Sequence, residues 1–369
     1  MKVVVTGTRG IYGIQGGVET HCEELYPRLV ELGCDVTVLR RSCYVRDDNR
    51  IDWYKGIRII DTYAPHSKAL EAIIHTALAV IKARLFGADI VHIHAVGPGL
   101  CVPLARLLGM RVIATNHGPD YDRQKWGKLA RTILKMGEWC QAKFSHKVIV
   151  ISPVIADILA KKYGREDTVL IPNGVNKPKK ATEFGYLQGL GLEPKRYVLC
   201  VGRFVPEKGF DLIIKAWEQM TLEQKRGCKL VIAGDADHKT DYSRELKALA
   251  NRCTDVVLTG FIKGDKLNQI FSGATLFAMP SYHEGLPIAL LEAMSYDLDV
   301  LASDIPADRL PELDKDGDFF ACGDSDALRR TLMGKLANGQ KERHHDLSRY
   351  DWDSIAKATY QEYEKLMRL

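Results

Sequence analysis

Residues 281–294 read Ser-Tyr-His-Glu-Gly-Leu-Pro-Ile-Ala-Leu-Leu-Glu-Ala-Met, and their pattern is the most informative one in the chain. It follows the apolar run 274–279, which has the length of a buried parallel strand, and Pro287 stands where a helical pattern of apolar residues begins. A strand that enters a helix through such a turn exposes the first backbone amides of the helix, and these amides attract an anion. Glu284 and Glu292 flank this place with hydrogen-bond acceptors. The segment therefore suits a ligand that carries both phosphate and hydroxyl groups, although an ordinary strand, turn and helix with two solvated glutamates would give the same pattern.

A second segment, 197–210, reads Tyr-Val-Leu-Cys-Val-Gly-Arg-Phe-Val-Pro-Glu-Lys-Gly-Phe. Its apolar start predicts another buried strand, which is followed by Arg203 and Lys208 ahead of a helix over 211–219. Ligands of open α/β sheets bind in the crevice at the carboxyl ends of the strands, so both cations are expected to lie there. A guanidinium and an ammonium group are suited to bind a diphosphate.

Together the two segments resemble the retaining glycosyltransferases of the GT-B fold, in particular those of family 4. The family carries a Gly-Arg-x4-Lys-Gly segment, matched here by 202–209, followed later by Glu-x7-Glu, matched by Glu284 and Glu292. The resemblance extends over essentially the whole chain. It implies an α/β protein with two facing Rossmann-like, doubly wound domains and a cleft between them. It also implies a C-terminal helix that crosses back to the first domain.

Length and composition agree with this reading. The 369 residues are too many for one typical core and suit two α/β domains. The net charge of +5 is mild: it fits anionic ligands or an anionic lipid surface, and no nucleic-acid motif accompanies it. The nine cysteines are scattered, without a Cys-x-x-Cys pair, which indicates a reducing compartment rather than disulfides or structural zinc.

The chain begins with a strand pattern rather than a signal peptide, and its longest apolar run, near 72–81, is too short to span a bilayer. We therefore expect a cytoplasmic protein, with peripheral contact to the inner face of the plasma membrane as a second expectation. The domains are expected over these ranges: 1–175 with a returning helix at 353–369, a Pro- and Lys-containing linker at 176–195, and a second domain at 196–352.

The first domain opens with a strand over 2–6 and a glycine-rich turn before a helix. Strand patterns then alternate with helices, which predicts a doubly wound parallel sheet; they lie at 35–40, 57–61, 90–94, 111–114 and 147–151. Gly16 and Gly17 match the glycine pair with which the family approaches the donor phosphate and the acceptor. Here that loop is longer than the usual form and lacks its customary proline.

Histidines mark two places in this domain. His92 and His94 share one face of a strand, so a metal pair is conceivable, but no third ligand has suitable spacing and we interpret them as structural. The segment 114–121, Ala-Thr-Asn-His-Gly-Pro-Asp-Tyr, resembles a family motif whose histidine contacts the transferred sugar or the acceptor. The resemblance gives that role to His117 and suggests Asp120 as a further acceptor contact.

Residues 122–147 form a basic amphipathic helix candidate. Its lysines and arginines, among them Lys128 and Arg131, are expected on one side, with Leu129 and Trp139 mainly elsewhere. Such a helix could rest on anionic lipid or contact a lipid-linked acceptor. A domain helix with a solvated basic face is an equal alternative.

In the second domain, Asp235-Ala-Asp237 and Asp324-Ser-Asp326 look like the Asp-x-Asp metal site of the other major glycosyltransferase fold, but neither has the context of that fold. Asp297 and Asp299 stand where the family usually reads Gly-x-Pro, so the local turn is expected to differ. The resemblance implies catalytic roles for His117, Arg203, Lys208 and Glu284. It implies donor contacts for Gly16, Gly17, Arg203, Lys208, Ile262, Glu284, Gly285, Leu286, Ile288 and Glu292.

The function implied is transfer of a sugar from a nucleotide-diphosphate-sugar to a hydroxyl of a glycan acceptor, with retention and without a metal or other cofactor. A lipid-linked oligosaccharide in bacterial O-antigen or capsule synthesis is the expected acceptor. Two alternatives remain at this point: a nucleotide-sugar 2-epimerase of the same architecture, which needs no acceptor, and a nucleotide-sugar-binding subunit without turnover.

Overall fold

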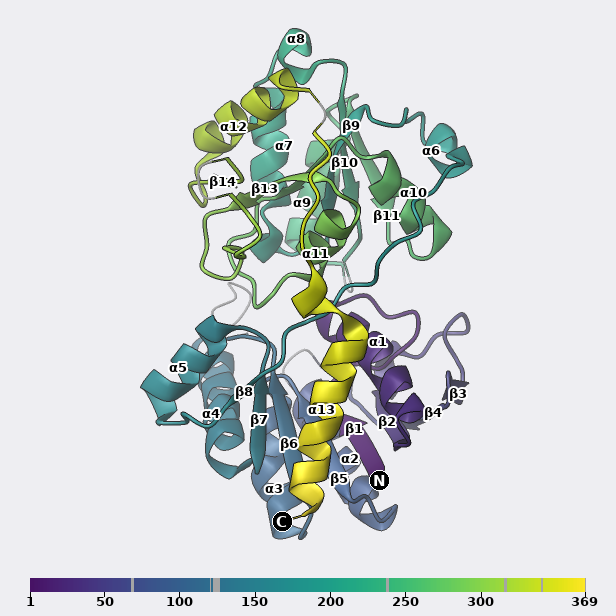
Figure 1. Cartoon of the computed structure of the whole chain (residues 1–369), viewed down its shortest axis with the longest axis vertical. Helices are drawn as coiled ribbons and strands as arrows, with labels where there is room; N and C mark the ends of the chain where they lie inside the picture. Colours follow the sequence, from purple (N-terminus) through teal and green to yellow (C-terminus); the bar gives the residue numbers. More distant parts are fainter. Residues whose placement is uncertain are drawn as a thin grey trace. The chain divides into compact units, whose positions relative to one another are not determined.

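The computed structural model describes residues 1–67, 70–119, 121, 127–236, 239–314, 317–339 and 341–368. The chain divides into two compact units. The first consists of Met1–Gly174 together with Tyr350–Leu369, and the second of Val175–Arg349. Figure 1 follows the chain from purple through teal and green to yellow, and shows that the last helix belongs to the first unit.

Within the described residues, the first unit contains an eight-stranded sheet in the order β3-β4-β2-β1-β5-β6-β7-β8. All neighbouring strands are parallel except β3 and β4. The strands are β1 (Lys2–Thr6), β2 (Asp35–Arg41), β3 (Trp53–Tyr54), β4 (Ile57–Thr62), β5 (Ile90–His94), β6 (Arg111–Asn116), β7 (Lys147–Val150) and β8 (Val169–Leu170). The predicted parallel sheet is confirmed.

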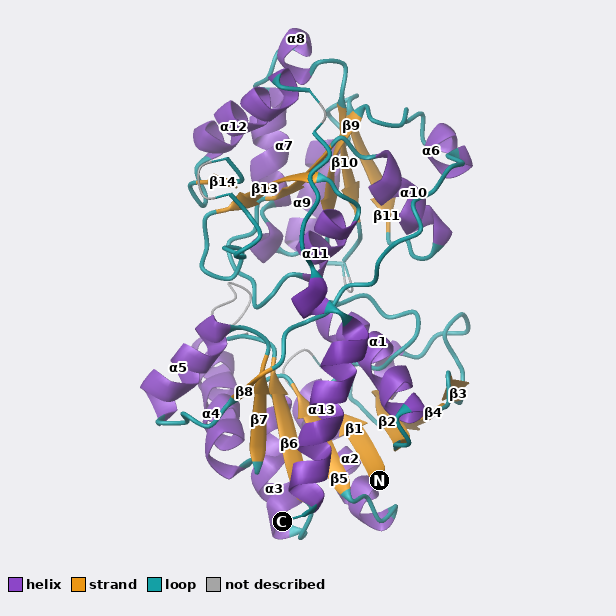
Figure 2. Ribbon diagram, in the orientation of Figure 1, coloured by secondary structure: helices purple, strands orange, loops and turns teal. Residues whose placement is uncertain are grey.

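Helices cover both faces of this sheet (Figure 2). They are α1 (Gly17–Glu31), α2 (Glu71–Leu85), α3 (Val102–Leu107), α4 (Lys128–Phe144), α5 (Pro153–Tyr163) and α13 (Trp352–Met367). Successive residues of a strand point to opposite faces: Val3 and Val5 pack with α1 and α13, whereas Val4 packs with α2 and α3. Burial on both faces explains the continuous apolar runs in the sequence.

The C-terminal helix α13 completes the core of the first unit, as predicted. Trp352 and Tyr363 are buried against α1 and the sheet. Gly174 lies directly under the Trp352 ring, where a Cβ atom would come within 2.5 Å of ring carbon Cδ2. Glycine at this position therefore lets the indole pack onto the backbone.

The second unit holds a six-stranded parallel sheet in the order β11-β10-β9-β12-β13-β14, counted over the same described ranges. Its strands are β9 (Tyr197–Val201), β10 (Lys229–Ala233), β11 (Val256–Gly260), β12 (Leu276–Met279), β13 (Asp299–Ser303) and β14 (Phe319–Phe320). Its helices are α6 (Gly185–Gly189), α7 (Phe210–Glu218), α8 (Leu222–Lys225), α9 (Asp241–Ala250), α10 (Asp265–Gly273), α11 (Ile288–Ser295) and α12 (Ser325–Ala337).

Three expectations differ from the structure in detail. The segment 176–195 is not wholly a linker, since it contains α6 and belongs to the second unit. The chain returns to the first unit at Tyr350, not at residue 353. The basic helix predicted over 122–147 is α4, which ends at Phe144 because Lys147 already pairs in β7; residues 122–126 lie outside the described ranges.

Asp297, where the family usually has glycine, adopts a left-handed backbone with φ 59°. Its carboxylate accepts a hydrogen bond from Lys180 Nζ at 2.8 Å and lies 3.0 Å from His344 Nδ1. These side-chain contacts hold a conformation that glycine adopts without strain.

No helix in the described part of the chain is long and apolar enough to cross a membrane. All nine cysteines are free.

Candidate active site

The two motif loops of the second unit are joined through their backbones. Gly209, at φ 62°, lies against Pro280, where an added Cβ atom would come within 2.1 Å of the Pro280 carbonyl oxygen. The Tyr282 N–H donates to the Glu207 carbonyl oxygen at 2.8 Å. The contact is possible because β9 and β12, which precede the two loops, are neighbours in the sheet. The Lys-Gly pair of the first motif therefore has a role in packing the two loops together.

This contact brings two of the four predicted catalytic side chains together. Lys208 Nζ donates to Glu284 Oε1 at 2.6 Å. Only 19% of the lysine side chain and 11% of the glutamate side chain are exposed. A short ion pair with so little solvent is held in place before any ligand arrives.

The predicted helix start is confirmed. Pro287 caps α11, which begins at Ile288, and both Leu286 and Ile288 are buried. Gly285 lies in the turn between the ion pair and the helix, and Glu292 lies half-buried on the helix itself. The first amides of this helix lie a few residues from Glu284, so a diphosphate placed there would have both amides and an ammonium group beside it.

Two further predicted donor contacts lie on loops of the same sheet edge. Arg203 follows the carboxyl end of β9 and is half-buried, and Ile262 follows that of β11 and is also half-buried. In a parallel sheet these ends lie at one edge, although β11 is two strands from β9. The structure thus puts the predicted donor residues of this unit on one edge of its sheet.

Asp308, which the sequence analysis missed, is fully buried after β13. Among the described residues, neither of its carboxylate oxygens has a hydrogen-bond partner. Burial raises the pKa of this carboxyl well above its ordinary value; the Glu284 carboxylate raises it further, and Lys208 lowers it. Burial beside the ion pair therefore favours the neutral form of the Asp308 carboxyl. The signal for Asp308 in the sequence was its position after β13, the strand that pairs with β12.

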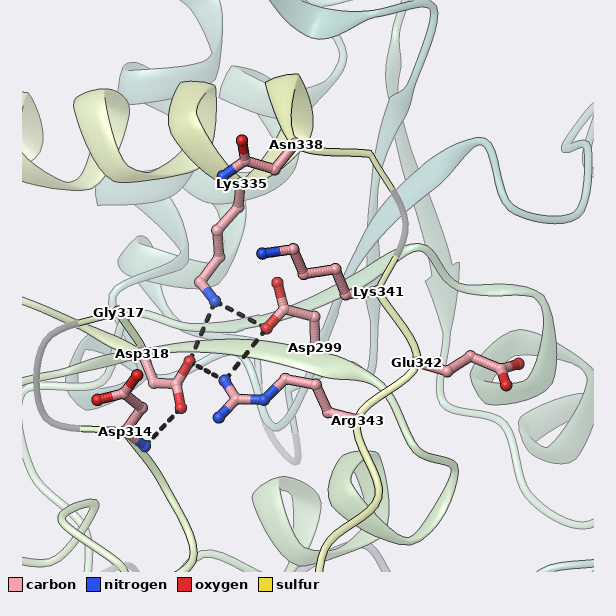
Figure 3. Close-up of a pocket in the computed structure, with 9 residues that line it drawn as sticks. All are labelled: Asp299, Asp314, Gly317, Asp318, Lys335, Asn338, Lys341, Glu342 and Arg343. Atoms are coloured by element: carbon pink, nitrogen blue, oxygen red, sulfur yellow. Dashed lines mark hydrogen bonds and ion pairs between the residues drawn. The ribbon is translucent and has the colours of Figure 1, made fainter.

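The pocket in Figure 3 lies at the other end of this sheet, since it is lined by Asp299 at the start of β13. Lys335 Nζ donates to Asp299 at 2.7 Å and to Asp318 at 3.1 Å, and Arg343 also pairs with Asp318. Two cations thus balance two buried carboxylates, and this network ties the segment after α12 to β13.

In the first unit, the glycine pair forms the start of α1. Gly16, at φ 153°, lies where a Cβ atom would meet Glu19 Oε2 at 2.1 Å, whereas a Cβ atom on Gly17 would meet nothing within 4 Å. Glu19 is buried and accepts hydrogen bonds from Arg9 Nη2 at 2.8 Å and Thr8 Oγ1 at 3.1 Å. Gly16 is therefore needed to close the loop, and Gly17 offers open space to a ligand.

His117 follows β6 and lies in a cluster of histidines. Its Nε2 is 3.0 Å from His94 Nδ1, and its ring centroid is 5.0 Å from that of His21 on α1. Burial lowers the pKa of His94 and of His117 well below the ordinary value, and that of His21 to about 4. All three rings are therefore neutral at neutral pH. Asp120, the second predicted acceptor contact, lies outside the described residues.

His21 corrects one expectation. Sequence spacing offers no third ligand beside His92 and His94, but the fold brings His21 close to His94 and His117. One ring nitrogen from each of His21, His94 and His117 lies within 4.8 Å of the others, and three imidazoles could hold a transition metal. The hydrogen bond between His94 and His117 accounts for their close approach without an ion.

The outer face of α4 also differs from expectation. Leu129 is 76% exposed, and Met136 and Trp139 are exposed as well, so apolar and basic side chains share the surface. The sequence pattern predicts the basic side chains on one side of the helix and the apolar side chains mainly elsewhere.

Comparison with protein families identifies the class. Residues 15–177 match the family model described as Glycosyltransferase Family 4, and residues 195–338 match the model described as Glycosyl transferases group 1. Together the two models span the chain except for its ends and a short segment between them. The chain is a glycosyltransferase with the GT-B fold. Within that class it is family 4-like, as the Gly-Arg-x4-Lys-Gly and Glu-x7-Glu segments indicated.

Two relatives are similar to this chain over most of its length. An uncharacterised glycosyltransferase of Methanocaldococcus jannaschii is 24% identical, with 96% of each chain covered. A protein named as a teichuronic acid biosynthesis glycosyltransferase of Bacillus subtilis is 23% identical over 78% of this chain and 76% of its own.

Two solved structures share the fold. The sucrose-phosphate synthase of Thermosynechococcus elongatus superposes with a TM-score of 0.81 at 21% identity, covering 100% of this chain and 99% of its own. The Anabaena protein HepE in complex with UDP-glucose gives 0.76 at 17% identity, covering 99% of this chain and 100% of its own.

Replacing Gly209 by alanine tests the backbone contact of the two loops. Gly209→Ala should lower the thermal unfolding midpoint more than Gly164→Ala. Both glycines are left-handed, at φ 62° and 63°, but only Gly209 has an atom in the way of a Cβ. Gly164→Ala should cost only the left-handed strain of about 1–2 kcal/mol. Equal midpoints for the two variants would rule out the contact.

The buried carboxyl of Asp308 gives a pH-dependent prediction. The folded chain keeps this proton at pH values where the unfolded chain has lost it, so the carboxyl's contribution to stability falls as pH rises above the unfolded pKa. The Asp308→Asn variant has no carboxyl to ionise at this position. Its unfolding midpoint, relative to that of the parent protein, should therefore increase as the pH rises from acid to neutral. The control is Asp304→Asn, because Arg309 holds the pKa of Asp304 below its ordinary value. The unfolding midpoint of this control, relative to that of the parent protein, should decrease as the pH rises. A gap between Asp308→Asn and the parent that does not change with pH would contradict the assignment.

Proposed function

We propose that this glycosyltransferase moves a sugar from a nucleotide-diphosphate-sugar to a hydroxyl of a glycan acceptor, with retention of anomeric configuration and without a metal ion. The observation that carries the proposal is the Lys208–Glu284 ion pair beside the start of α11. It combines a cation and backbone amides for a diphosphate with a carboxylate for sugar hydroxyls. The UDP-glucose complex of the Anabaena protein, which shares the fold, supports a donor of this kind.

The ion pair defines a role for each side chain. When the donor binds, Lys208 turns its ammonium group to the diphosphate, and Glu284 accepts hydrogen bonds from sugar hydroxyls in place of the lysine. The neutral carboxyl of Asp308 limits the negative charge beside Glu284 at that moment. Arg203 adds a second cation for the phosphates, and Glu292 binds the ribose. Ile262 pairs with the base through its backbone.

Catalysis then depends mainly on stabilising the leaving group. The bond between the anomeric carbon and the phosphate oxygen breaks, and the departing diphosphate takes up the negative charge beside Lys208 and the α11 amides. The acceptor oxygen bonds to the same face of the sugar, and its proton passes to the departing phosphate oxygen. His117 positions the reacting groups. Because backbone amides and cationic side chains stabilise the negative charge of the diphosphate, these steps do not require a metal ion.

The acceptor we propose is a lipid-linked oligosaccharide at an anionic membrane. On α4, Lys128, Arg131, Lys135 and Lys143 are exposed, and the one carboxylate, Glu138, is buried and accepts hydrogen bonds from Tyr121 and Tyr163. The exposed face of this helix is thus purely cationic, with apolar side chains between the charges, which is the composition of helices that lie in a lipid interface. The Bacillus relative named for teichuronic acid synthesis supports a role in surface polysaccharide.

Nucleotide binding and turnover test the donor site. A thermal-shift panel of UDP, GDP, dTDP and CMP should show stabilisation by one nucleoside diphosphate that persists in EDTA. Lys208→Ala and Glu284→Ala should each lower turnover by about a hundred-fold or more, because each removes a group that contacts charge or hydroxyls in the transition state.

Lys215→Ala is the matched control, since Lys215 forms an exposed ion pair with Asp211 on α7. It should leave turnover unchanged. Near-native turnover in folded Lys208→Ala and Glu284→Ala would refute the site. Loss of turnover in EDTA with recovery on adding a metal would refute metal independence. A new nucleotide-sugar formed without an acceptor would indicate an epimerase, and no product at all a binding subunit.

Vesicle sedimentation tests the membrane surface. The parent protein should bind phosphatidylglycerol vesicles at low salt and phosphatidylcholine vesicles weakly. Joint replacement of Lys128, Arg131 and Lys135 by Gln should abolish binding. The same replacement of Lys161, Arg244 and Lys365, three exposed cations on other helices, removes equal charge and should preserve it. Absence of binding by the parent, or equal loss in both triple variants, would contradict a role for α4.

A further inference from the structure

Three histidines from three different elements meet inside the first unit. His21 lies on α1, His94 is the last residue of β5, and His117 follows β6. One ring nitrogen of each lies within 4.8 Å of those of the other two. The ring centroids are 5.0 Å apart for His21 and His117, 5.3 Å for His94 and His117, and 5.6 Å for His21 and His94. The three imidazoles therefore surround a common point.

These separations are close to those of three imidazoles on one tetrahedral metal ion. When each Zn–N distance is about 2.0–2.1 Å, the ligand nitrogens are about 3.3 Å apart and the ring centroids about 5 Å apart. The 3.0 Å between His94 Nδ1 and His117 Nε2 and the three centroid distances fit this geometry. Small rotations of the rings would therefore suffice to bind an ion.

Hydrogen bonds explain only part of this arrangement. One of them joins His94 to His117. Within the described part of the chain, however, His21 is hydrogen-bonded to Asn173 and to neither of the other two histidines. A shared ion would give all three rings a common partner.

Two of the rings are oriented by contacts to residues outside the cluster. His21 Nδ1 lies 3.0 Å from Asn173 Oδ1, and His94 Nε2 lies 2.5 Å from the Tyr26 hydroxyl. His21 Nε2 and His94 Nδ1 therefore remain for an ion. Histidines that bind metals in proteins are oriented in this way, through a hydrogen bond from the second ring nitrogen to an oxygen.

Burial and ligand type indicate how an ion would enter and which one would bind. His21 and His94 are buried, whereas His117 is half-buried, so the cluster is reached from the side of His117. Three protein ligands leave a fourth position of a tetrahedral ion for water or another small ligand. Imidazole nitrogens bind zinc, copper and nickel, whereas magnesium and calcium prefer oxygen ligands.

We propose that His21, His94 and His117 form a binding site for a transition-metal ion of the zinc type, and that the bound ion inhibits the enzyme. The inhibition rests on the proposed function, in which His117 positions the reacting groups. An ion on His117 holds its ring in the cluster and adds a fourth ligand beside it, so that the ring no longer contacts a sugar or acceptor oxygen. Transfer without a metal ion is consistent with a site of this kind.

Titration with Co²⁺ tests the site without substrate, because Co²⁺ binds in place of zinc and absorbs visible light. After treatment with EDTA and removal of the chelator, the full chain should bind one equivalent of Co²⁺ with the intense visible bands of tetrahedral coordination. Zn²⁺ should displace it. All nine cysteines are free, so the spectrum must lack a thiolate-to-cobalt charge-transfer band for the ligands to be histidines.

Variants of the cluster and matched controls identify the ligands. His21→Asn should weaken Co²⁺ binding by about a hundred-fold, because it removes one of three ligands, whereas His66→Asn, at an exposed histidine, should bind as the parent does. Tyr26→Phe covers a failure of His21→Asn to fold. It removes only the hydroxyl beside His94 and should weaken binding by about ten-fold, whereas Tyr360→Phe on α13 should not.

Turnover measured with and without Zn²⁺ tests the inhibition. Zn²⁺ should lower turnover of the parent, and EDTA should restore it. His21→Asn should keep its turnover and need about a hundred-fold more Zn²⁺ for the same inhibition. Cys322→Ser, which removes an exposed thiol, should remain as sensitive as the parent.

Absence of Co²⁺ binding by the parent, a thiolate spectrum, or unchanged binding in both His21→Asn and Tyr26→Phe would overturn the site. Zn²⁺ that binds to the cluster without lowering turnover would overturn the inhibition. Because the Co²⁺ titration needs no turnover, it is independent of the proposed function. If the ion binds as predicted but the metal-free protein transfers no sugar, the site stands and the proposed function falls.

Discussion

The close approach of Gly209 to Pro280 is the constraint that holds the proposed donor site together. It fixes two loops that are distant in the sequence, so that Lys208, the residue before the glycine, meets Glu284 on the other loop at 2.6 Å. A side chain at 209 would separate the loops and the ion pair with them. Conformational freedom at one backbone position thus sets the position of a charge that the proposed chemistry uses.

The two units handle their buried polar groups in different ways. In the second unit, charges are paired: Lys208 with Glu284, and Lys335 with Asp299 and Asp318. In the first unit, burial keeps the histidines and tyrosines uncharged, and their order comes from hydrogen bonds. A diphosphate needs the first kind of surroundings, and the orientation of a neutral imidazole needs the second.

Much of the fold follows from the sequence, because buried parallel strands leave continuous apolar runs that alternate with helical patterns. β3 could not be predicted, because it consists of only two residues, Trp53 and Tyr54. Two residues are too few to show the alternation of apolar and polar side chains that marks a strand. The exposed Leu129 and Trp139 of α4 show a second limit: helical spacing tells which residues share a side, but not which sides the neighbouring elements cover.

The candidate site likewise contains residues that the sequence predicts and residues that it does not. Arg203, Lys208, Glu284 and Glu292 could be predicted because each lies at a fixed distance from a strand end. Asp308 and His21 could not, because what matters about them is a contact with a residue far along the chain. The tertiary fold alone brings His21 of α1 to His117, or places Asp308 beside Glu284. Motif spacing therefore located the groups proposed to touch the donor, and the structure supplied the groups around them.

The return of α13 has a consequence for how the chain folds during synthesis. One face of the first sheet is covered by Trp352, Ile355 and Tyr363, which are synthesised after the whole of the second unit. The second unit is complete by Arg349, whereas the first unit, although started earlier, still exposes apolar strand surface at that moment. A nascent chain that has emerged only as far as Arg349 would thus hold a finished second unit and an open first one, and exposed apolar sheet surface of this kind is what chaperones bind.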